Sequence, residues 1–182
     1  MRKFHRPLVS TATAVAVSVL VVGCSVQIGG SGDLNTSKLE NELTADIEEA
    51  LPGIPVSVQC PSDIPMAAET SFTCDATVAG QSLTFDITQT DDEGNVDSEP
   101  EQAVLLMSKI DEQVAPQLSE QLGGQWQVNC NPPGSQDGVL VAPPGATFEC
   151  SFSGVGSNGT ELVDQPMEIT VDDLAGNVSW RA

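Results

Sequence analysis

The chain has 182 residues, with only six Lys and Arg against 26 Asp and Glu and a formal net charge of −20. Three of the basic residues are Arg2, Lys3 and Arg6, so removal of residues 1–23 leaves three basic residues against 26 acidic ones, a formal charge of −23. Such a field repels nucleic acid and anionic surfaces, which excludes a nucleic-acid-binding role. The single His is His5, so the rest of the chain lacks the usual general base of nucleophilic catalysis.

The first residues are typical of an export signal. Basic residues precede an apolar stretch at 12–22, which is shorter than the roughly 20 residues of a spanning helix. The stretch ends Leu20-Val21-Val22-Gly23-Cys24, which resembles the bacterial lipobox. The resemblance implies a diacylglycerol thioether on Cys24 and cleavage before it, and two acyl chains give stable anchoring. The alternative is an ordinary signal with an incidental cysteine.

After the signal peptide at 1–23, the Gly- and Ser-rich residues 24–33 are expected to form a flexible tether. A helix should follow, because Ser37-Lys38-Leu39-Glu40 is a capping-box pattern. One apolar stripe then recurs every four residues, at Leu39, Leu43, Ile47 and Leu51. Pro52-Gly53 should end the helix.

Alternating apolar and polar residues next predict short antiparallel strands. The expected strands are 56–60, 71–78 and 82–88, with a hairpin turn at 79–81 and a polar turn at 93–95 leading into a last short strand.

A second helix is expected from the capping-box pattern Ser98-Glu99-Pro100-Glu101. Its stripe comprises Leu106, Ile110, Val114, Leu118 and Leu122. Pro116 should kink or split this helix, and Gly123-Gly124 should end it. Further strands are expected at 125–130, 147–152 and 167–171, with a turn at 175–177 before a last one.

An internal repeat organises these elements. Four segments of the first half recur in order in the second: 58–60 as 128–130, 70–74 as 146–150, 85–88 as 167–170, and 93–96 as 175–178. The growing offset indicates insertions near 131–145 and 153–160. We therefore expect an α+β fold of two tandem modules, 34–97 and 98–182, each an N-terminal helix on a small antiparallel sheet.

Four cysteines follow Cys24, and an even number in an exported protein is typical of a disulfide framework. The repeat places one pair in each module, which predicts disulfides Cys60–Cys74 and Cys130–Cys150. Free thiols or metal ligation are the alternatives, although zinc sites need closely spaced Cys or His pairs.

The order of these motifs also resembles a known family. A helix, a Val-x-Cys segment, an aromatic residue two positions before a second Cys and a Gly-Asn-Val turn are similar to an actinobacterial domain of unknown function, found in small lipoproteins of mycobacteria and corynebacteria. Residues 34–97 fit well, and residues 101–182 fit less well because Asn131 follows Cys130. The resemblance implies location and fold and carries no catalytic residues. The layout is also similar to the two-module secreted β-lactamase inhibitor proteins of streptomycetes, a likeness of fold alone.

Candidate chemistry is sparse. A Ser–Lys pair would have to use Lys38 or Lys109, which should lie on exposed helix faces. Paired carboxylates could act on sugars, but Trp126 and Trp180, the chain's only tryptophans, are expected in the core. Oxygen ligands alternate through 91–99 as in a calcium loop, yet the glycine is misplaced, which favours a plain polar turn. No metal and no cofactor are expected.

These observations favour a non-catalytic binding module of the cell envelope rather than an enzyme. Its expected partners are the membrane, through lipid on Cys24, and an envelope protein. The expected contact region is the pair of loops 131–145 and 153–165. The alternatives are an inhibitor of a secreted or envelope hydrolase, and a cell-wall lipoprotein that carries a lipid or another ligand.

Overall fold

The computed structural model of the chain describes residues 32–182. The expected signal peptide, Cys24 and most of the expected tether lie outside the described residues. The structure is mostly β, with 44% strand and 21% helix. The helices are α1 (Thr36–Ala50) and α2 (Met107–Leu122), and the strands form three antiparallel sheets.

Two of the sheets have four strands each. The first sheet, in the order β1-β2-β3-β4, comprises Val56–Gln59, Ser71–Val78, Gln81–Gln89 and Val96–Pro100. The second sheet, in the order β10-β9-β8-β6, comprises Val178–Arg181, Glu161–Val171, Thr147–Val155 and Gln125–Asn129. The third sheet, called the ribbon below, pairs β5 (Ala103–Leu106) with β7 (Val139–Ala142).

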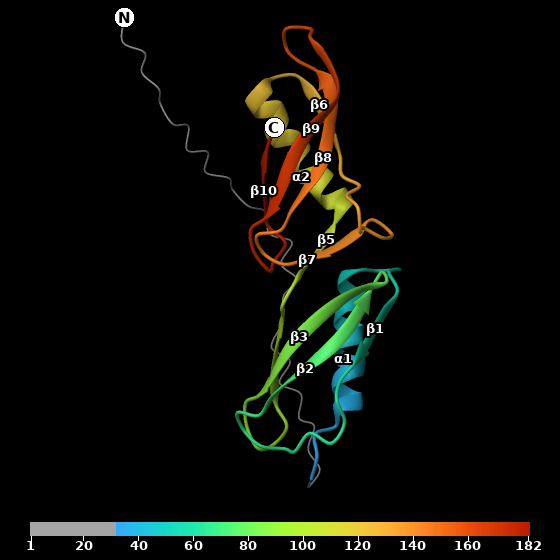
Figure 1. The fold of residues 1–182 in the computed structure, drawn as a ribbon, viewed down its shortest axis with the longest axis vertical. Coiled ribbons are helices and arrows are strands. Elements are labelled where there is room, and N and C mark those ends of the chain that lie inside the picture. Colours follow the sequence, from blue (N-terminus) through green and yellow to red (C-terminus); the bar gives the residue numbers. More distant parts are fainter. Residues whose placement is uncertain (1–31) are drawn as a thin grey trace, which may run out of the picture.

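Figure 1 shows how these parts are stacked along the long axis of the molecule. The first sheet and α1 occupy the lower part, the second sheet and α2 occupy the upper part, and the ribbon lies between them. The described chain begins at the lower end. The β8–β9 hairpin projects at the upper end.

The first sheet forms because its strands alternate between outward polar and inward apolar residues. In β2 the inward residues Cys74, Ala76 and Val78 are buried, and every residue between them is exposed. The stripe of α1 packs on this inner face, with Leu39 and Leu43 buried. Burying each leucine contributes about 1.5–3 kcal/mol to stability. The expected stripe and strand alternation are thus confirmed.

The turn between β2 and β3 is also where the sequence predicts it. Ala79 and Gly80 both have positive φ, 48° and 75°, as a two-residue type I′ hairpin turn requires. The turn brings Val78 opposite Gln81 and sets the register of the whole hairpin.

The ribbon is shared between two hydrophobic cores. On β5, Ala103 and Leu105 belong to the core under the second sheet, while Val104 packs against the core under the first. On β7, Val139 is fully buried in the first core and Ala142 is buried in the second. Because successive strand residues point to opposite faces, the ribbon covers one core with each face.

A glutamine side chain joins the ribbon to the first sheet. Gln81 Nε2 donates to Val139 O at 3.0 Å, and Gln81 Oε1 accepts from Val141 N at 3.0 Å. The amide therefore bonds the β7 backbone much as a neighbouring strand would. Next to it, the Gln136 side chain lies against Gly80, where a Cβ would meet its Oε1 at 2.9 Å.

The expected fold class is therefore wrong. The protein is mostly β, with two helices, three sheets and two disulfides, instead of two tandem helix-on-sheet modules. The reason is the ribbon, because Val139 comes from the second half of the chain and completes the core of the first. The apolar run 103–106 suits a buried strand as well as a helix, and the capping-box pattern at 98–101 wrongly favoured the helix.

Both expected helix starts are wrong as well. Asn35, not Ser37, caps α1, and its side chain accepts a hydrogen bond from Lys38 N. The expected capping box at 98–101 lies in β4 and the turn after it, where Ser98 pairs with Ile87. α2 begins only at Met107 and continues through Pro116 to Gly123, so the helix is not split and ends where expected.

The two expected loops contain strands. The 131–145 segment includes β7, and most of the 153–165 segment extends the β8–β9 hairpin, with a register shift between Phe152 and Gly154. Because Gly and Pro flank β7 in the sequence, its four apolar residues were expected to be part of a loop. Residues 131–138 and 143–145, and the hairpin tip 156–160, are the parts of these segments that lie outside strands, and the contact role expected for 131–145 and 153–165 stays a prediction.

If the Gln81 amide holds the ribbon, replacing it should loosen the joint between the two cores. We expect Gln81→Ala to lower the free energy of unfolding by about 1–3 kcal/mol, the sum for two hydrogen bonds. Urea unfolding followed by circular dichroism measures this change. Gln127→Ala, on the exposed face of β6, is the matched control. A Gln81→Ala protein as stable as the control would contradict the assignment.

Candidate functional site

Two disulfides form the frame around which the candidate site residues lie. Cys60 follows β1 and bonds Cys74 of β2, and Cys130 follows β6 and bonds Cys150 of β8. These are the pairs expected from the repeat. Cys74, Cys130 and Cys150 are buried, with at most 6% of their surface exposed. Each bond ties an outer strand of a four-stranded sheet to its neighbour.

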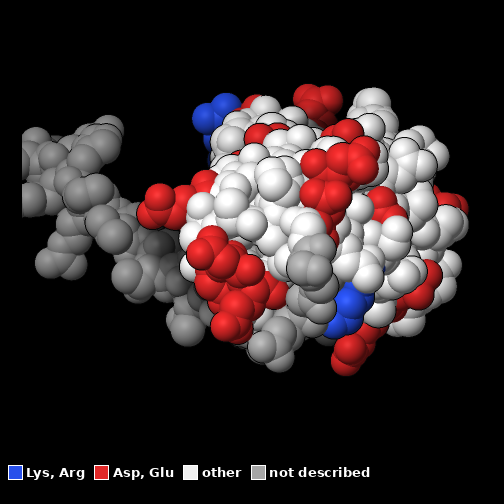
Figure 2. Space-filling model, turned by 90° about the horizontal axis from the view of Figure 1, so that it is seen from below, with Lys and Arg blue, Asp and Glu red and all other residues white. Residues whose placement is uncertain are grey.

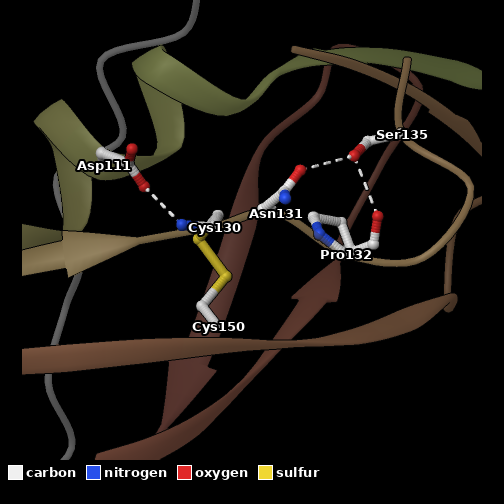
Figure 3. Close-up of a disulfide and its surroundings, with 6 residues drawn as sticks. All are labelled: Asp111, Cys130, Asn131, Pro132, Ser135 and Cys150. Atoms are coloured by element: carbon white, nitrogen blue, oxygen red, sulfur yellow. Dashed lines mark hydrogen bonds between the residues drawn. A yellow bond between two sulfur atoms is a disulfide. The ribbon is translucent and has the colours of Figure 1, made fainter. Parts of the chain in front are cut away.

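A helix carboxylate holds the backbone beside each disulfide. Glu40 Oε1 of α1 accepts from Cys60 N at 2.8 Å, and Asp111 Oδ1 of α2 accepts from Cys130 N at 3.1 Å (Figure 3). Burial raises the pKa of Asp111, and the hydrogen bond from Cys130 N opposes that rise. Each carboxylate thus links a helix to the end of a strand.

Neither role was predicted from the sequence, in which Glu40 is part of a capping-box pattern and Asp111 belongs to no recognised motif. The signal was present in the repeat, because the two carboxylates are 71 positions apart and the two cysteines they hold are 70 apart. The role of Gln89 was not predicted either: this residue is fully buried and bonds Pro65 O through Nε2 at 2.9 Å.

The candidate calcium loop 91–99 is an internally bonded turn. Asp91 Oδ1 accepts from Glu93 N at 2.8 Å and from Asn95 N at 3.1 Å, and Asp91 Oδ2 accepts from the Asn95 side chain. Asp97 and Glu99 lie farther on, in β4. Among residues 32–182, no three His, Cys, Asp or Glu side chains come together as a metal site would need.

The same turn occurs before β10. Asp173 Oδ1 accepts from Asn177 N at 3.1 Å, and Asp173 Oδ2 accepts from Asn177 Nδ2 at 2.6 Å. The hydrogen bond from the Asn177 side chain is the main cause of the lowered pKa of Asp173. The Asn95 side chain lowers the pKa of Asp91 in the same way. Both aspartates are therefore turn-forming residues.

The basic residues and tryptophans also have structural partners. Lys38 and Lys109 lie on the helices, with their ammonium groups 3.8 Å from Glu42 and 2.8 Å from Glu112. Trp126 is 8% exposed and meets Phe152 edge-on at 5.7 Å. Trp180 is partly buried and packs against the same core, so both indoles contribute to the core as expected.

Acidic side chains far outnumber basic ones on the exposed surface. Figure 2, seen from the lower end of Figure 1, shows Asp and Glu in several clusters, while Lys and Arg cover only small areas. The third basic residue in the described chain, Arg181, lies 2.6 Å from Glu168. At the upper end, Val155 and Val163 are exposed apolar residues of the β8–β9 hairpin, at 48% and 65%.

The role of Asp111 can be tested by two substitutions. Asp111→Ala leaves the buried Cys130 N–H without a partner, so we expect a loss of about 1–3 kcal/mol in the free energy of unfolding. Asp111→Asn keeps an acceptor and removes a charge whose burial is unfavourable, so its stability at neutral pH should equal or exceed that of the parent. Urea unfolding measures both, and equal losses for both variants would contradict this role.

The turn aspartates should contribute to acid sensitivity. Because the pKa of Asp173 lies below its ordinary value of 3.8, its carboxylate stabilises the fold above that pH, and this contribution is lost as the pH falls further. We expect Asp173→Asn to lose less melting temperature than the parent between about pH 6 and about pH 3. Asp46→Asn, on the exposed face of α1, is the control for loss of one charge. Identical pH profiles of the parent and Asp173→Asn would contradict the assignment.

Neither described helix has the length and apolar character of a membrane-spanning helix. Among known proteins, a family model matches part of the chain. No curated protein and no solved structure matches it. Residues 19–94 match the family model described as domain of unknown function (DUF4333), which ends before β4 and leaves the rest of the chain outside the match.

Proposed function

We propose that the chain is an extracytoplasmic lipoprotein, anchored to the cell membrane through lipid on Cys24, that acts as a non-catalytic binding module of the cell envelope. The observation that carries the proposal is the pair of disulfides that follow a lipobox-like sequence. Structural disulfides form and persist in oxidising compartments outside the cytoplasm. The family that residues 19–94 match has no described activity, which leaves the site itself as the guide.

The geometry supports binding because, within residues 32–182, the outer faces of both four-stranded sheets carry exposed polar side chains. The carboxylates of Glu40 and Asp111 hold backbone amides beside the disulfides. Those of Asp91 and Asp173 hold backbone amides of their own turns. Disulfides, the helix carboxylates and the shared ribbon together present these faces in a fixed arrangement. A preorganised surface loses less entropy when it binds a partner.

The anchoring step is tested by the mass of the mature protein. We expect native membranes to yield a chain that begins at Cys24 and carries a diacylglycerol thioether, with the membrane fraction holding nearly all of it. Cys24→Ser should abolish the added lipid mass and leave the precursor uncleaved. Ser25→Ala, one residue on, is the matched control and should remain lipidated. A mature chain that begins elsewhere and carries no lipid would refute the anchor.

A further inference from the structure

The outer face of the first sheet carries two carboxylates in direct opposition. The strand registers place Thr73, Asp86 and Glu99 side by side on β2, β3 and β4. The side chains of Asp86 and Glu99 are exposed, and neither carboxylate forms an ion pair or a side-chain hydrogen bond with another described residue. Like charges directly opposite each other destabilise an antiparallel sheet. The folded protein therefore keeps this pair at a cost in stability.

The second sheet has an equivalent row of three outward-facing residues, and one of them is basic. Its row beside the disulfide consists of Glu149, Glu168 and Arg181 on β8, β9 and β10. Arg181 faces Glu168 in the register, and its Nη2 lies 2.6 Å from Glu168 Oε1. Because Glu149 precedes Cys150 as Thr73 precedes Cys74, Arg181 occupies the row position that Glu99 has in the first sheet. In the second sheet, a guanidinium therefore occupies this position and pairs with the neighbouring carboxylate.

The rest of the outer face of the first sheet adds negative charge and no positive charge. Asp97 lies two residues before Glu99 on β4, and Asp75 is a diagonal neighbour of Asp86 across β2 and β3. Such diagonal neighbours are about 7–8 Å apart, within reach of one long side chain. The other exposed residues of this face are Ser, Thr and Gln. The surface is therefore polar, acidic and formed by regular strands.

We propose that this face docks an arginine-bearing segment of a basic protein partner. The partner's guanidinium takes the place against Asp86 and Glu99 that Arg181 takes against Glu168 in the second sheet. Guanidinium–carboxylate pairs are strong and directional, and they would remove the repulsion between the two carboxylates. The inference rests on the proposed binding role and gives that role a partner chemistry and a surface.

The test uses the full chain in neutral detergent micelles and a fluorescent peptide of alternating Arg and Thr with one Lys. Fluorescence anisotropy measures affinity at about 0.15 M salt, where interactions between distant exposed charges are largely screened. Carbodiimide then links the peptide lysine to the carboxylates it touches, and peptide mass spectrometry identifies them. We expect cross-links at Asp75, Asp86, Asp97 or Glu99.

Charge-reversal variants distinguish binding at this face of the first sheet from general attraction to the net charge of the protein. Glu99→Arg places the chain's own guanidinium on the row, so it should lower the affinity at least about tenfold. Glu149→Arg makes the same change in net charge on the second sheet and should lower it less than about twofold. Equal losses in the two variants would overturn the proposal, because the peptide would then sense only net charge.

The melting temperatures of two reciprocal variants show whether a loss of binding is caused by misfolding. Glu99→Arg should raise the melting temperature by roughly 1–4 °C, since it relieves a like-charge pair, and Arg181→Glu should lower it similarly. Arg181→Glu should also produce a second set of cross-links, on the second sheet. A Glu99→Arg chain that melts below the parent, or cross-links spread evenly over both sheets in the parent, would contradict the docking face. A lipidated chain that binds an envelope protein equally well with Glu99 or Arg at this position would sink this inference and leave the proposed function standing.

Discussion

The structure depends on one shared element, the two-stranded ribbon that lies between the two cores. Its strands alternate, so Leu105 and Ala142 close one core while Val104 and Val139 close the other. Neither core could keep its apolar residues from water if the ribbon moved away. Burial at about 25 cal/mol per Å² of apolar surface therefore favours a fixed relation between the two four-stranded sheets.

Polar contacts set the position of the ribbon, because apolar packing alone does not specify register. The Gln81 amide bonds both a carbonyl and an amide of β7, which fixes the strand along its length as well as against the first sheet. Glu40 and Asp111 do the same for the strand ends beside the disulfides. Buried polar groups must be paired, so a displaced strand would leave these groups unsatisfied.

Local patterns predicted the local structure well. The period-2 alternation of β2 and β3, the stripe of α1 and the glycine turns are all visible in the sequence, as is the repeat that pairs the cysteines. The ribbon could not be predicted in the same way, because 103–106 and 139–142 are short apolar runs that pair across more than thirty residues. Their strand conformation arises from that pairing and from burial on both faces, which override the weak local preference. Similarly, Glu40 matches a capping-box pattern in the sequence, but its side chain bonds Cys60 N, a contact that is set by tertiary packing.

The distribution of charge then separates the frame from the surface that is open to a partner. The lysines and the arginine of the described chain all lie beside carboxylates of their own element or a neighbouring strand. The carboxylates of Glu40 and Asp111 bond backbone amides. Most of the other carboxylates remain in water, where charge favours solubility and long-range attraction of basic groups. On a regular sheet, side chains are held at fixed spacing, so charges there are more specific than charges on loops. On the outer face of the first sheet, Asp86 and Glu99 are the two carboxylates that face each other directly, and their repulsion lowers the stability of the fold. A site that lowers stability without a packing reason is where function is best sought.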